Sequence, residues 1–313
     1  MNAVAISVVI PFYDEAASVP ALFERLIPVL AALERSWEVI CVDDGSGDET
    51  CAALQAVHRH HSAVRIIKLS RNFGKEAALS AGLLRASGDR VLIMDGDLQH
   101  PPELLPEMMH VQDGGIDMVF GLRRSRTTEG PVRSGFSALF YRLFSMASEV
   151  RLPKDASDFR LMARRVVDAL NALPEHTRFM KGLYAWVGYS QQAVLYDVEP
   201  RPNGHSKWSF LKLVGYAWNG IVSFSVVPLR LWSFIGIAIA KLALLYAGWI
   251  VGTTLIQGRE VPGYATQAAA NFFQDGLQLL SIGVLGENVE RIIAETKRRT
   301  FYIIEEMQGF DPE

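Results

Sequence analysis

Residues 6–15 read I-S-V-V-I-P-F-Y-D-E, a β-branched run that leads into a proline and an acidic pair. The run predicts a strand over 6–10, and apolar residues at helical spacing from Ser18 to Leu33 predict a helix after it. The same succession continues to residue 94, with strands expected at 37–42, 64–69 and 91–94 and helices at 48–58 and 77–86. Strict alternation of this kind is typical of an α/β fold with a parallel, doubly wound sheet.

Acidic pairs follow three of the predicted strands, namely Asp14 with Glu15, Asp43 with Asp44, and Asp95 with Asp97. Ligands of open α/β sheets bind at the carboxyl ends of the strands, so these three loops should converge. Crowded carboxylates repel one another, and a bound cation or a hydrogen-bonding ligand would relieve that repulsion. The alternative is that each acid only caps a turn or a helix, which is our interpretation of Asp48.

Composition excludes several classes of protein. The chain has 313 residues, half of them hydrophobic, which is incompatible with intrinsic disorder. The 31 Lys and Arg residues are outweighed by 34 Asp and Glu residues, giving a net charge of -3 that argues against a nucleic-acid partner. The two cysteines, Cys41 and Cys51, form neither a metal motif nor a disulfide framework, so we interpret both as structural.

Two long apolar segments lie in the last third of the chain, which explains a mean hydropathy of +0.15. Residues 231–256 contain one charge, Lys241, and residues 264–285 contain one, Asp275. A bilayer core is spanned by about 20 apolar helical residues, so both segments are expected to be transmembrane helices. Basic residues flank the pair on its outer ends, which predicts that both chain termini are cytoplasmic.

The resulting domain organisation is a cytosolic domain carried on a membrane hairpin. We assign residues 1–215 to that domain, 216–230 to an amphipathic juxtamembrane segment, 231–256 and 264–285 to the spans, and 286–313 to a cytosolic tail. The first nine residues lack the features of a signal peptide.

In the second span, polar residues recur at +4, +3 and +4 as Gln267, Asn271, Gln274 and Gln278. Lipid cannot satisfy these amides, so we expect the stripe to face a protein interface, most plausibly in a homo-oligomer.

The segment M-D-G-D-L-Q-H-P-P (94–102) places hard oxygen donors directly after an apolar strand. Asp95, Asp97 and Gln99 recur at every second residue, a spacing that suits Mg²⁺ or Mn²⁺ bridging a diphosphate. The D-x-D triplet alone is weak evidence, and its position after a strand and before a proline strengthens it.

Several motifs together resemble glycosyltransferase family 2: V-V-I-P-F-Y-D-E (8–15), V-D-D-G-S-G-D-E-T (42–50), L-S-R-N-F-G-K-E-A-A-L (69–79) and the 94–102 segment. Downstream motifs are similar to those of the polyprenyl-phosphate glycosyltransferases, of the bactoprenol glucosyltransferase or dolichol-phosphate mannosyltransferase type. These are D-F-R-L (158–161), R-F-M-K-G-L-Y-A-W-V-G-Y (178–189) and R-P-N-G-H-S-K-W (201–208). The resemblance spans nearly the whole chain. One departure is Gly96, which stands where the family triplet usually has alanine.

The resemblance implies an A-type glycosyltransferase domain and inverting transfer of a sugar, with glucose the first expectation. The donor would be a UDP-sugar and the acceptor undecaprenyl phosphate, at the cytoplasmic face of a bacterial inner membrane. The alternatives are another sugar on the same lipid, such as mannose or an amino-sugar, and a catalytically inactive membrane scaffold.

The resemblance also assigns roles to individual residues. Nucleotide-sugar contacts are implied for Pro11, Tyr13, Glu15, Val42, Asp44, Arg71, Lys75, Asp95, Gly96 and Arg123, with Asp44 accepting from the base. Arg201 and Lys207 would bind the acceptor phosphate, and Asp95, Asp97 and Gln99 the metal. Asp158 is the implied catalytic base. A phosphate monoester is already largely dianionic at neutral pH, its second pKa being about 6, so Asp158 could instead position a cation or pair with Arg160 or Arg164.

Overall fold

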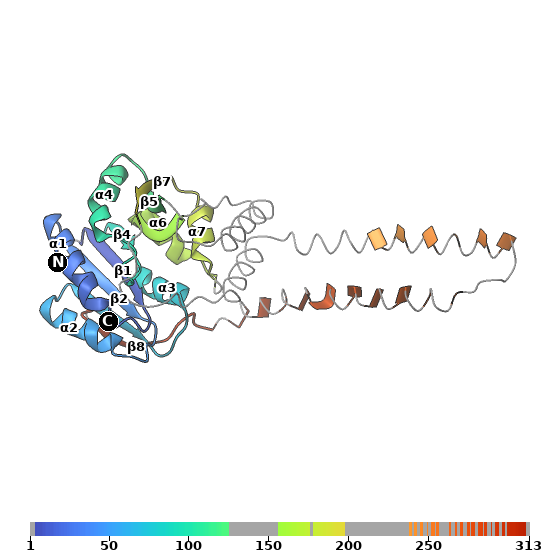
Figure 1. Ribbon diagram of the computed structural model, residues 1–313, viewed down its shortest axis with the longest axis horizontal. Coiled ribbons are helices and arrows are strands. Elements are labelled where there is room, and N and C mark those ends of the chain that lie inside the picture. The colour runs from blue at the N-terminus through green and yellow to red at the C-terminus, as the bar shows by residue number, and fades with distance from the viewer. Residues whose placement is uncertain are drawn as a thin grey trace.

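A computed structural model describes residues 4–124, 156–175, 178–197 and 299–310, and scattered positions between 238 and 297. Figure 1 shows one α/β domain built from the continuous parts. The first half consists of β1 (Ile6–Phe12), α1 (Val19–Ala32), β2 (Trp37–Asp43), α2 (Thr50–His60), β3 (Val64–Leu69), α3 (Lys75–Arg85), β4 (Arg90–Ile93), the 3₁₀ turn η1 (Pro102–Leu104), α4 (Leu105–Asp113) and β5 (Met118–Arg123). The remainder consists of β6 (Ala156–Ala163), α6 (Arg164–Ala172), α7 (Met180–Trp186), β7 (Gln191–Tyr196) and β8 (Ile304–Gln308).

The strands and helices predicted up to residue 94 are confirmed, with shifts of a few residues at their ends. The second helix begins at Thr50 and not at Asp48, because the Asp48 carboxylate accepts the backbone N–H of Thr50 at 3.0 Å and so lies in the turn before the helix. This hydrogen bond confirms Asp48 as a turn residue, one of the two roles expected for it, and Glu49 occupies the N-cap position.

The described strands form an eight-stranded sheet in the order β7-β5-β6-β4-β1-β2-β3-β8. Its centre, β4-β1-β2-β3, is parallel. The expected parallel sheet is confirmed for these four strands, but the sheet as a whole is mixed, because β6 runs antiparallel to both β4 and β5, and β8 runs antiparallel to β3. From β5 onward, strands and helices no longer alternate strictly. The rule that strands joined by a crossover helix run parallel therefore does not apply to the rest of the sheet.

Helices cover both faces of the sheet, so the core has two parts (Figure 1). On one face α1, α2 and α4 bury Leu26, Leu54 and Met108 against the strands. On the other face α3, α6 and α7 do the same with residues such as Leu79 and Val167. The central strands are apolar on both faces because both faces are covered.

The C-terminal strand β8 belongs to the same eight-stranded sheet. It pairs with β3 in the register Ile66 with Gln308 and Ile67 with Met307. Residues 304–308, which belong to the predicted 286–313 tail, thus pair with the sheet of the first domain. The physical reason is that β3 would otherwise present an open edge of unpaired backbone groups, which β8 satisfies.

The predicted spans 231–256 and 264–285 lie largely outside the described residues, as does the whole juxtamembrane segment 216–230. Within the part of the chain that is described, no helix is long and apolar enough to cross a membrane. The described positions inside both predicted spans, from Ala238 to Ile256 and from Gln267 to Leu285, are helical.

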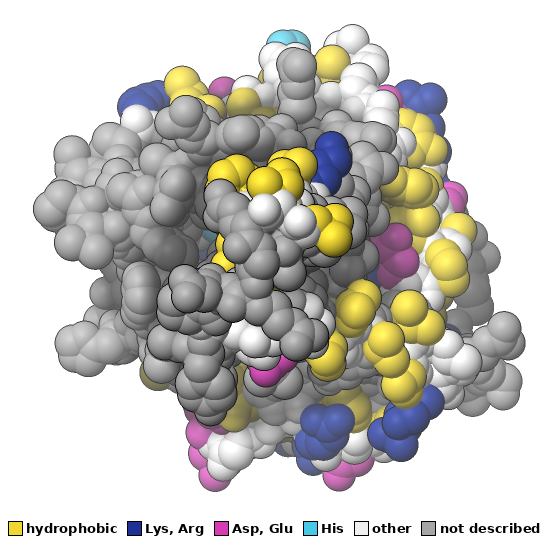
Figure 2. All heavy atoms as spheres, turned by 90° about the vertical axis from the view of Figure 1, so that its right-hand side faces the viewer, with side chains coloured by type: hydrophobic (Ala, Val, Ile, Leu, Met, Phe, Trp, Pro, Cys, Tyr) yellow, Lys and Arg dark blue, Asp and Glu magenta, His cyan; other side chains and the backbone are white. Residues whose placement is uncertain are grey.

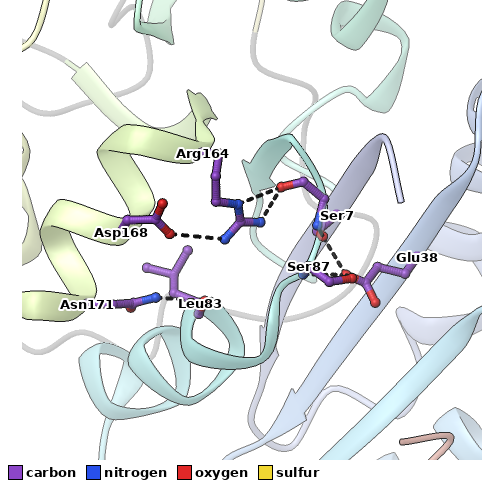
Figure 3. A network of polar contacts seen from close by, with 8 residues as sticks. Ser7, Glu38, Leu83, Ser87, Arg164, Asp168 and Asn171 are labelled. Carbon is purple, nitrogen blue, oxygen red and sulfur yellow. Dashed lines mark hydrogen bonds and ion pairs between the residues drawn. The ribbon is translucent and has the colours of Figure 1, made fainter. Parts of the chain in front are cut away.

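A network of polar contacts connects the amino ends of the central strands (Figure 3). This end of the sheet is opposite the end that carries the acidic loops. The buried Glu38 carboxylate accepts from Ser7 Oγ at 2.6 Å and from the backbone N–H of Ser87 at 2.7 Å, and it pairs with Arg65 at 2.8 Å. Arg164 Nε donates to the carbonyl of residue 88 at 2.9 Å. These contacts join β1, β2 and the turn before β4, and they are remote from the candidate site.

Candidate active site

The loops after β1, β2 and β4 meet at one edge of the sheet. The backbone N–H of Gly47 donates to Asp14 Oδ1 at 2.8 Å, and that of Glu15 donates to Thr50 Oγ1 at 2.8 Å, which joins the first two loops. A methyl group on Gly96 would lie 3.2 Å from Glu15 Oε2, which places the third loop against the first. The predicted convergence of the three acidic loops is confirmed.

Lys75, the first residue of α3, lies between two carboxylates that come from other elements. Its Nζ is 2.5 Å from Asp95 Oδ1 and 2.8 Å from Asp158 Oδ2. The exposed fractions of the three side chains are 34%, 28% and 19%. The cluster is therefore partly sheltered but still open to a ligand.

The charges of this cluster keep one another ionised. Burial alone would raise the pKa of Asp158, but the ammonium groups of Lys75 and Lys181 outweigh it and hold that pKa far below its ordinary value. Burial would likewise raise the pKa of Asp95, but the Lys75 ammonium outweighs it and lowers that pKa. Burial would lower the pKa of Lys75, yet the two carboxylates raise it well above normal. All three groups thus carry full charge at neutral pH.

Asp158 forms an ion pair with Lys75, and the nearby Arg160 guanidinium also helps to lower the pKa of Asp158. Arg164 donates to the carbonyl of residue 88, and Arg160 is buried against the aromatic rings of Phe120 and Tyr184. A carboxylate whose pKa is strongly lowered is a weak base. The geometry therefore favours a positioning role for Asp158, acting on Lys75.

The loop after β4 is a tight turn that carries the three predicted metal ligands. Asp97 Oδ1 accepts the backbone N–H of Gln99 at 3.1 Å. Leu98 between them has a φ of +63°, a left-handed conformation that is strained for a leucine. The backbone N–H of Asp95 donates to His100 Nδ1 at 3.0 Å. Strain of this kind persists where the surroundings hold the turn in place.

His100 was not predicted as a site residue. Its ring is buried, stacks on Phe159 at a centroid distance of 5.1 Å and meets Tyr196 edge-on at 6.2 Å. Burial lowers the pKa of His100, so the imidazole is neutral at pH 7. The one available sequence signal was its place directly after Gln99 in the 94–102 motif.

The donor set fits a metal ion that is shared with a diphosphate. Among the described residues, no three His, Cys, Asp or Glu side chains are grouped closely enough to hold a metal by themselves. Mg²⁺ is commonly bound by one or two carboxylates, with substrate phosphates and water completing the coordination. Asp95 and Asp97, partly exposed and two residues apart, suit that arrangement.

Asp44 has a structural role that the sequence did not predict. Its buried carboxylate accepts the backbone N–H groups of Phe73 and Gly74 at 2.7 and 2.9 Å. Burial raises the pKa of Asp44 in spite of these two hydrogen bonds. The guanidinium of Arg71 rests over the Phe73 ring at 4.0 Å. Asp44 thus holds the loop that carries Arg71 and leads into Lys75.

The other residues that are expected to contact the nucleotide-sugar differ in their exposure at this edge of the sheet. Tyr13 is 40% exposed just after β1, and Pro11 lies opposite Val42 in the β1–β2 register. The Val42 side chain is fully buried against α3, so it offers a ligand only its backbone. Arg123 ends β5, and its side chain lies outside the described atoms. Arg201 and Lys207 also lie outside the described residues.

Residues 7–170 match the family described as Glycosyl transferase family 2. The chain is 44% identical over 308 residues to an uncharacterized glycosyltransferase of Synechocystis sp., covering 98% of this chain and 97% of that protein. It is 38% identical over 307 residues to the SfII prophage-derived bactoprenol glucosyl transferase of Shigella flexneri, covering 98% and 99%. A solved structure of glucosyl-3-phosphoglycerate synthase from Mycobacterium tuberculosis, with Mn²⁺, UDP-glucose and phosphoglyceric acid, is 21% identical over 68% of this chain and 76% of that one, with a TM-score of 0.45.

The family match covers more than half of the chain, and the sequence relatives cover nearly all of it. The family expected from the sequence motifs is thereby confirmed. The chain belongs to glycosyl transferase family 2, and it is a glycosyltransferase.

Proposed function

We propose that the protein transfers glucose from UDP-glucose to a polyprenyl phosphate, with inversion at the anomeric carbon. The observation that carries the proposal is 38% identity over 98% of the chain to a bactoprenol glucosyl transferase. Similarity confined to the nucleotide-binding half would support only the donor. Because it extends through the C-terminal half, it supports the lipid acceptor as well.

The donor diphosphate would bind at the edge where the acidic loops meet. Asp95, Asp97 and Gln99 would hold Mg²⁺ or Mn²⁺, which when bound supplies Lewis-acid assistance to the departure of the nucleotide. Lys75 brings a positive charge to the same place, 2.5 Å from Asp95. The loop from Arg71 to Gly74, held by Asp44, would supply further contacts to the donor.

The acceptor phosphate needs little deprotonation, because a phosphate monoester has a second pKa of about 6. Asp158 would therefore act by holding Lys75, its partner at 2.8 Å, and not by removing a proton. Arg201 and Lys207 would bind the acceptor phosphate, since paired cations suit a dianion. Arg123 would contact a phosphate of either substrate.

A membrane hairpin formed by residues 231–256 and 264–285 would bring the lipid to this site. Support comes from the large apolar side chains that the first segment exposes: Leu242, Leu245, Tyr246, Trp249, Leu255 and Ile256, the last at 83%. Figure 2 shows hydrophobic side chains exposed among the described residues on the face that it presents. Exposed apolar surface of this extent calls for lipid or a partner. The catalytic domain would lie at the cytoplasmic face of a bacterial inner membrane.

We further propose a homo-oligomer in which the second predicted span meets another copy. The amides of Gln267, Asn271, Gln274 and Gln278 are exposed on helical positions. Such amides are satisfied in a membrane by other helices and not by lipid. Replacing all four with leucine and measuring the mass in nanodiscs tests this point, and an unchanged mass would refute it.

The transfer reaction is tested with purified full-length protein and undecaprenyl phosphate. Radiolabelled UDP-glucose, UDP-N-acetylglucosamine and GDP-mannose are supplied in parallel, and label in the organic phase is counted. We expect label from UDP-glucose to exceed that from the other two donors. A preference for either of them would refute glucose as the sugar, and transfer to water alone would refute the lipid acceptor.

A further inference from the structure

His100 touches both sides of the candidate site without being one of its predicted ligands. Its Nδ1 accepts the backbone N–H of Asp95 at 3.0 Å, and its ring stacks on Phe159 with planes 11° apart. Phe159 follows Asp158 directly on β6. A single buried ring therefore links the loop of Asp95 to the strand of Asp158.

The His100–Phe159 stack lies on the face of β6 opposite Asp158, while His100 Nδ1 is 4.0 Å from Asp95 Oδ2. Successive side chains of a strand point to opposite faces, so Phe159 and Asp158 point away from each other. Phe159 belongs to the core under α1 and α4, together with Met94 and Leu98 from the β4 loop. Packing on that face therefore fixes where Asp158 emerges on the other, and the hydrogen bond to His100 fixes Asp95 relative to it.

We propose that His100 is a positioning residue, which sets the separation between the 95–99 loop and Asp158 through these two contacts. The inference rests on the proposed donor-binding role of that loop. Both contacts need an imidazole, because the stack requires a flat ring and the hydrogen bond requires an acceptor on its edge. Phenylalanine supplies only the ring, and asparagine supplies only the acceptor, since its Oδ1 is as many bonds from Cα as Nδ1 is.

If His100 served packing alone, stability and activity would fall together across substitutions. If it positions the loop, the two properties separate. His100→Phe keeps the ring on Phe159 but leaves the Asp95 N–H without its acceptor, so the fold survives and the loop shifts. His100→Asn keeps the acceptor but loses the stack, so the fold weakens while the loop retains its anchor.

The test compares these two variants of the full-length protein, in detergent, with wild type and with His110→Phe as a matched control. His110 is exposed near the end of α4. Four quantities are measured for each: the melting temperature, the affinity for UDP with Mn²⁺, and kcat and KM for glucosyl transfer from UDP-glucose.

We expect His100→Phe to melt near wild type while its kcat falls by ~10²-fold, the loss expected when reacting groups are displaced by about 1 Å. UDP affinity should weaken with it. His100→Asn should melt lower but recover kcat to within a few-fold of wild type, and His110→Phe should match wild type throughout.

Equal kcat for His100→Phe and wild type would overturn the inference. A lower kcat for His100→Asn than for His100→Phe would overturn it too, because the acceptor would then not be the feature that matters. Absence of transfer by wild type would instead count against the proposed function. The inference about His100 could still be tested then, by comparing the UDP affinity and the melting temperature of the two variants.

Discussion

Lys75 Nζ lies 2.8 Å from Asp158 Oδ2, and it binds Asp95 Oδ1 at 2.5 Å. One ammonium group thus neutralises part of the charge on two carboxylates that come from β6 and from the loop after β4. Without it, the two acids would face an incoming diphosphate with their full repulsion. The Lys75 ammonium therefore lowers the repulsion that the proposed anionic donor would meet at this acidic edge.

Replacing Lys75 with methionine should reverse the pH dependence of stability. In wild type the pKa values of Asp95 and Asp158 both lie below the ordinary 3.8, so their contribution is complete above that pH and is lost only in stronger acid. In Lys75→Met the two carboxylates repel, and one pKa rises above 3.8. The folded state then loses stability as this carboxyl group ionises, that is, as the pH rises through the raised pKa. The variant should therefore have a higher melting temperature in mild acid than at neutral pH.

Melting curves across the acid-to-neutral range measure this dependence. The matched control is Lys68→Met, which removes a lysine paired with Glu305 at 2.9 Å on the surface and away from the cluster. The control should keep the wild-type dependence on pH. An unchanged dependence in Lys75→Met would mean that the two carboxylates do not sense each other.

Asp158→Asn should lower kcat by about 10²-fold or more, because Lys75 loses one of the two groups that hold it. The wild-type profile of kcat against pH should show no limb that belongs to Asp158, since the pKa of this group is held far below the working range. Asp168→Asn, which alters an exposed acid paired with Arg164 at 3.7 Å, serves as the control. Loss of an acidic limb near neutral pH in Asp158→Asn alone would identify a true general base and contradict the positioning role.

Gly96→Ala should destabilise the protein, although alanine is usual at this position in related motifs. The added methyl group would lie 2.5 Å from Cε1 of the buried Phe12 ring. Overpacking of this kind costs about 1–3 kcal/mol. Phe12→Leu should relieve the contact, so chemical denaturation of the double variant should show a smaller loss than the two single losses added together. Strict additivity would refute the contact.

Ending the chain after residue 299 should damage both stability and donor binding. The cut removes β8 from the edge of β3, and it removes the Ile303 carbonyl that accepts the N–H of Ser70 at 3.0 Å. Ser70 immediately precedes Arg71, so UDP affinity should fall along with the melting temperature. A chain ended after residue 310 keeps β8 and should match the full chain. Normal UDP affinity in the shorter chain would show that β8 does not support the donor loop.

The strands and helices up to residue 94 could be predicted because each carries its own period of apolar residues. The convergence of the acidic loops followed from the topology alone. The pairing of Lys75 with Asp158 could not be predicted, because it joins residues 83 positions apart that have no pattern in common.

The local sequence pattern also did not predict β8 or the hydrogen bond between Asp95 and His100. β8 reads I-E-E-M-Q, with little apolar content to mark it as part of a sheet. It is an edge strand, where backbone pairing and not side-chain burial fixes the position. The hydrogen bond from Asp95 to His100 depends on the left-handed turn at Leu98, which no residue preference for leucine would suggest.

The most direct test of the account is the rate at which the full-length protein moves radiolabelled glucose from UDP-glucose to undecaprenyl phosphate, measured for wild type and for Asp97→Asn with Mg²⁺ or Mn²⁺ present. We predict a labelled glucosyl lipid from wild type and nearly none from Asp97→Asn, with the same melting temperature for both proteins. Ordinary transfer by Asp97→Asn, or no labelled lipid from folded wild-type protein, would contradict it.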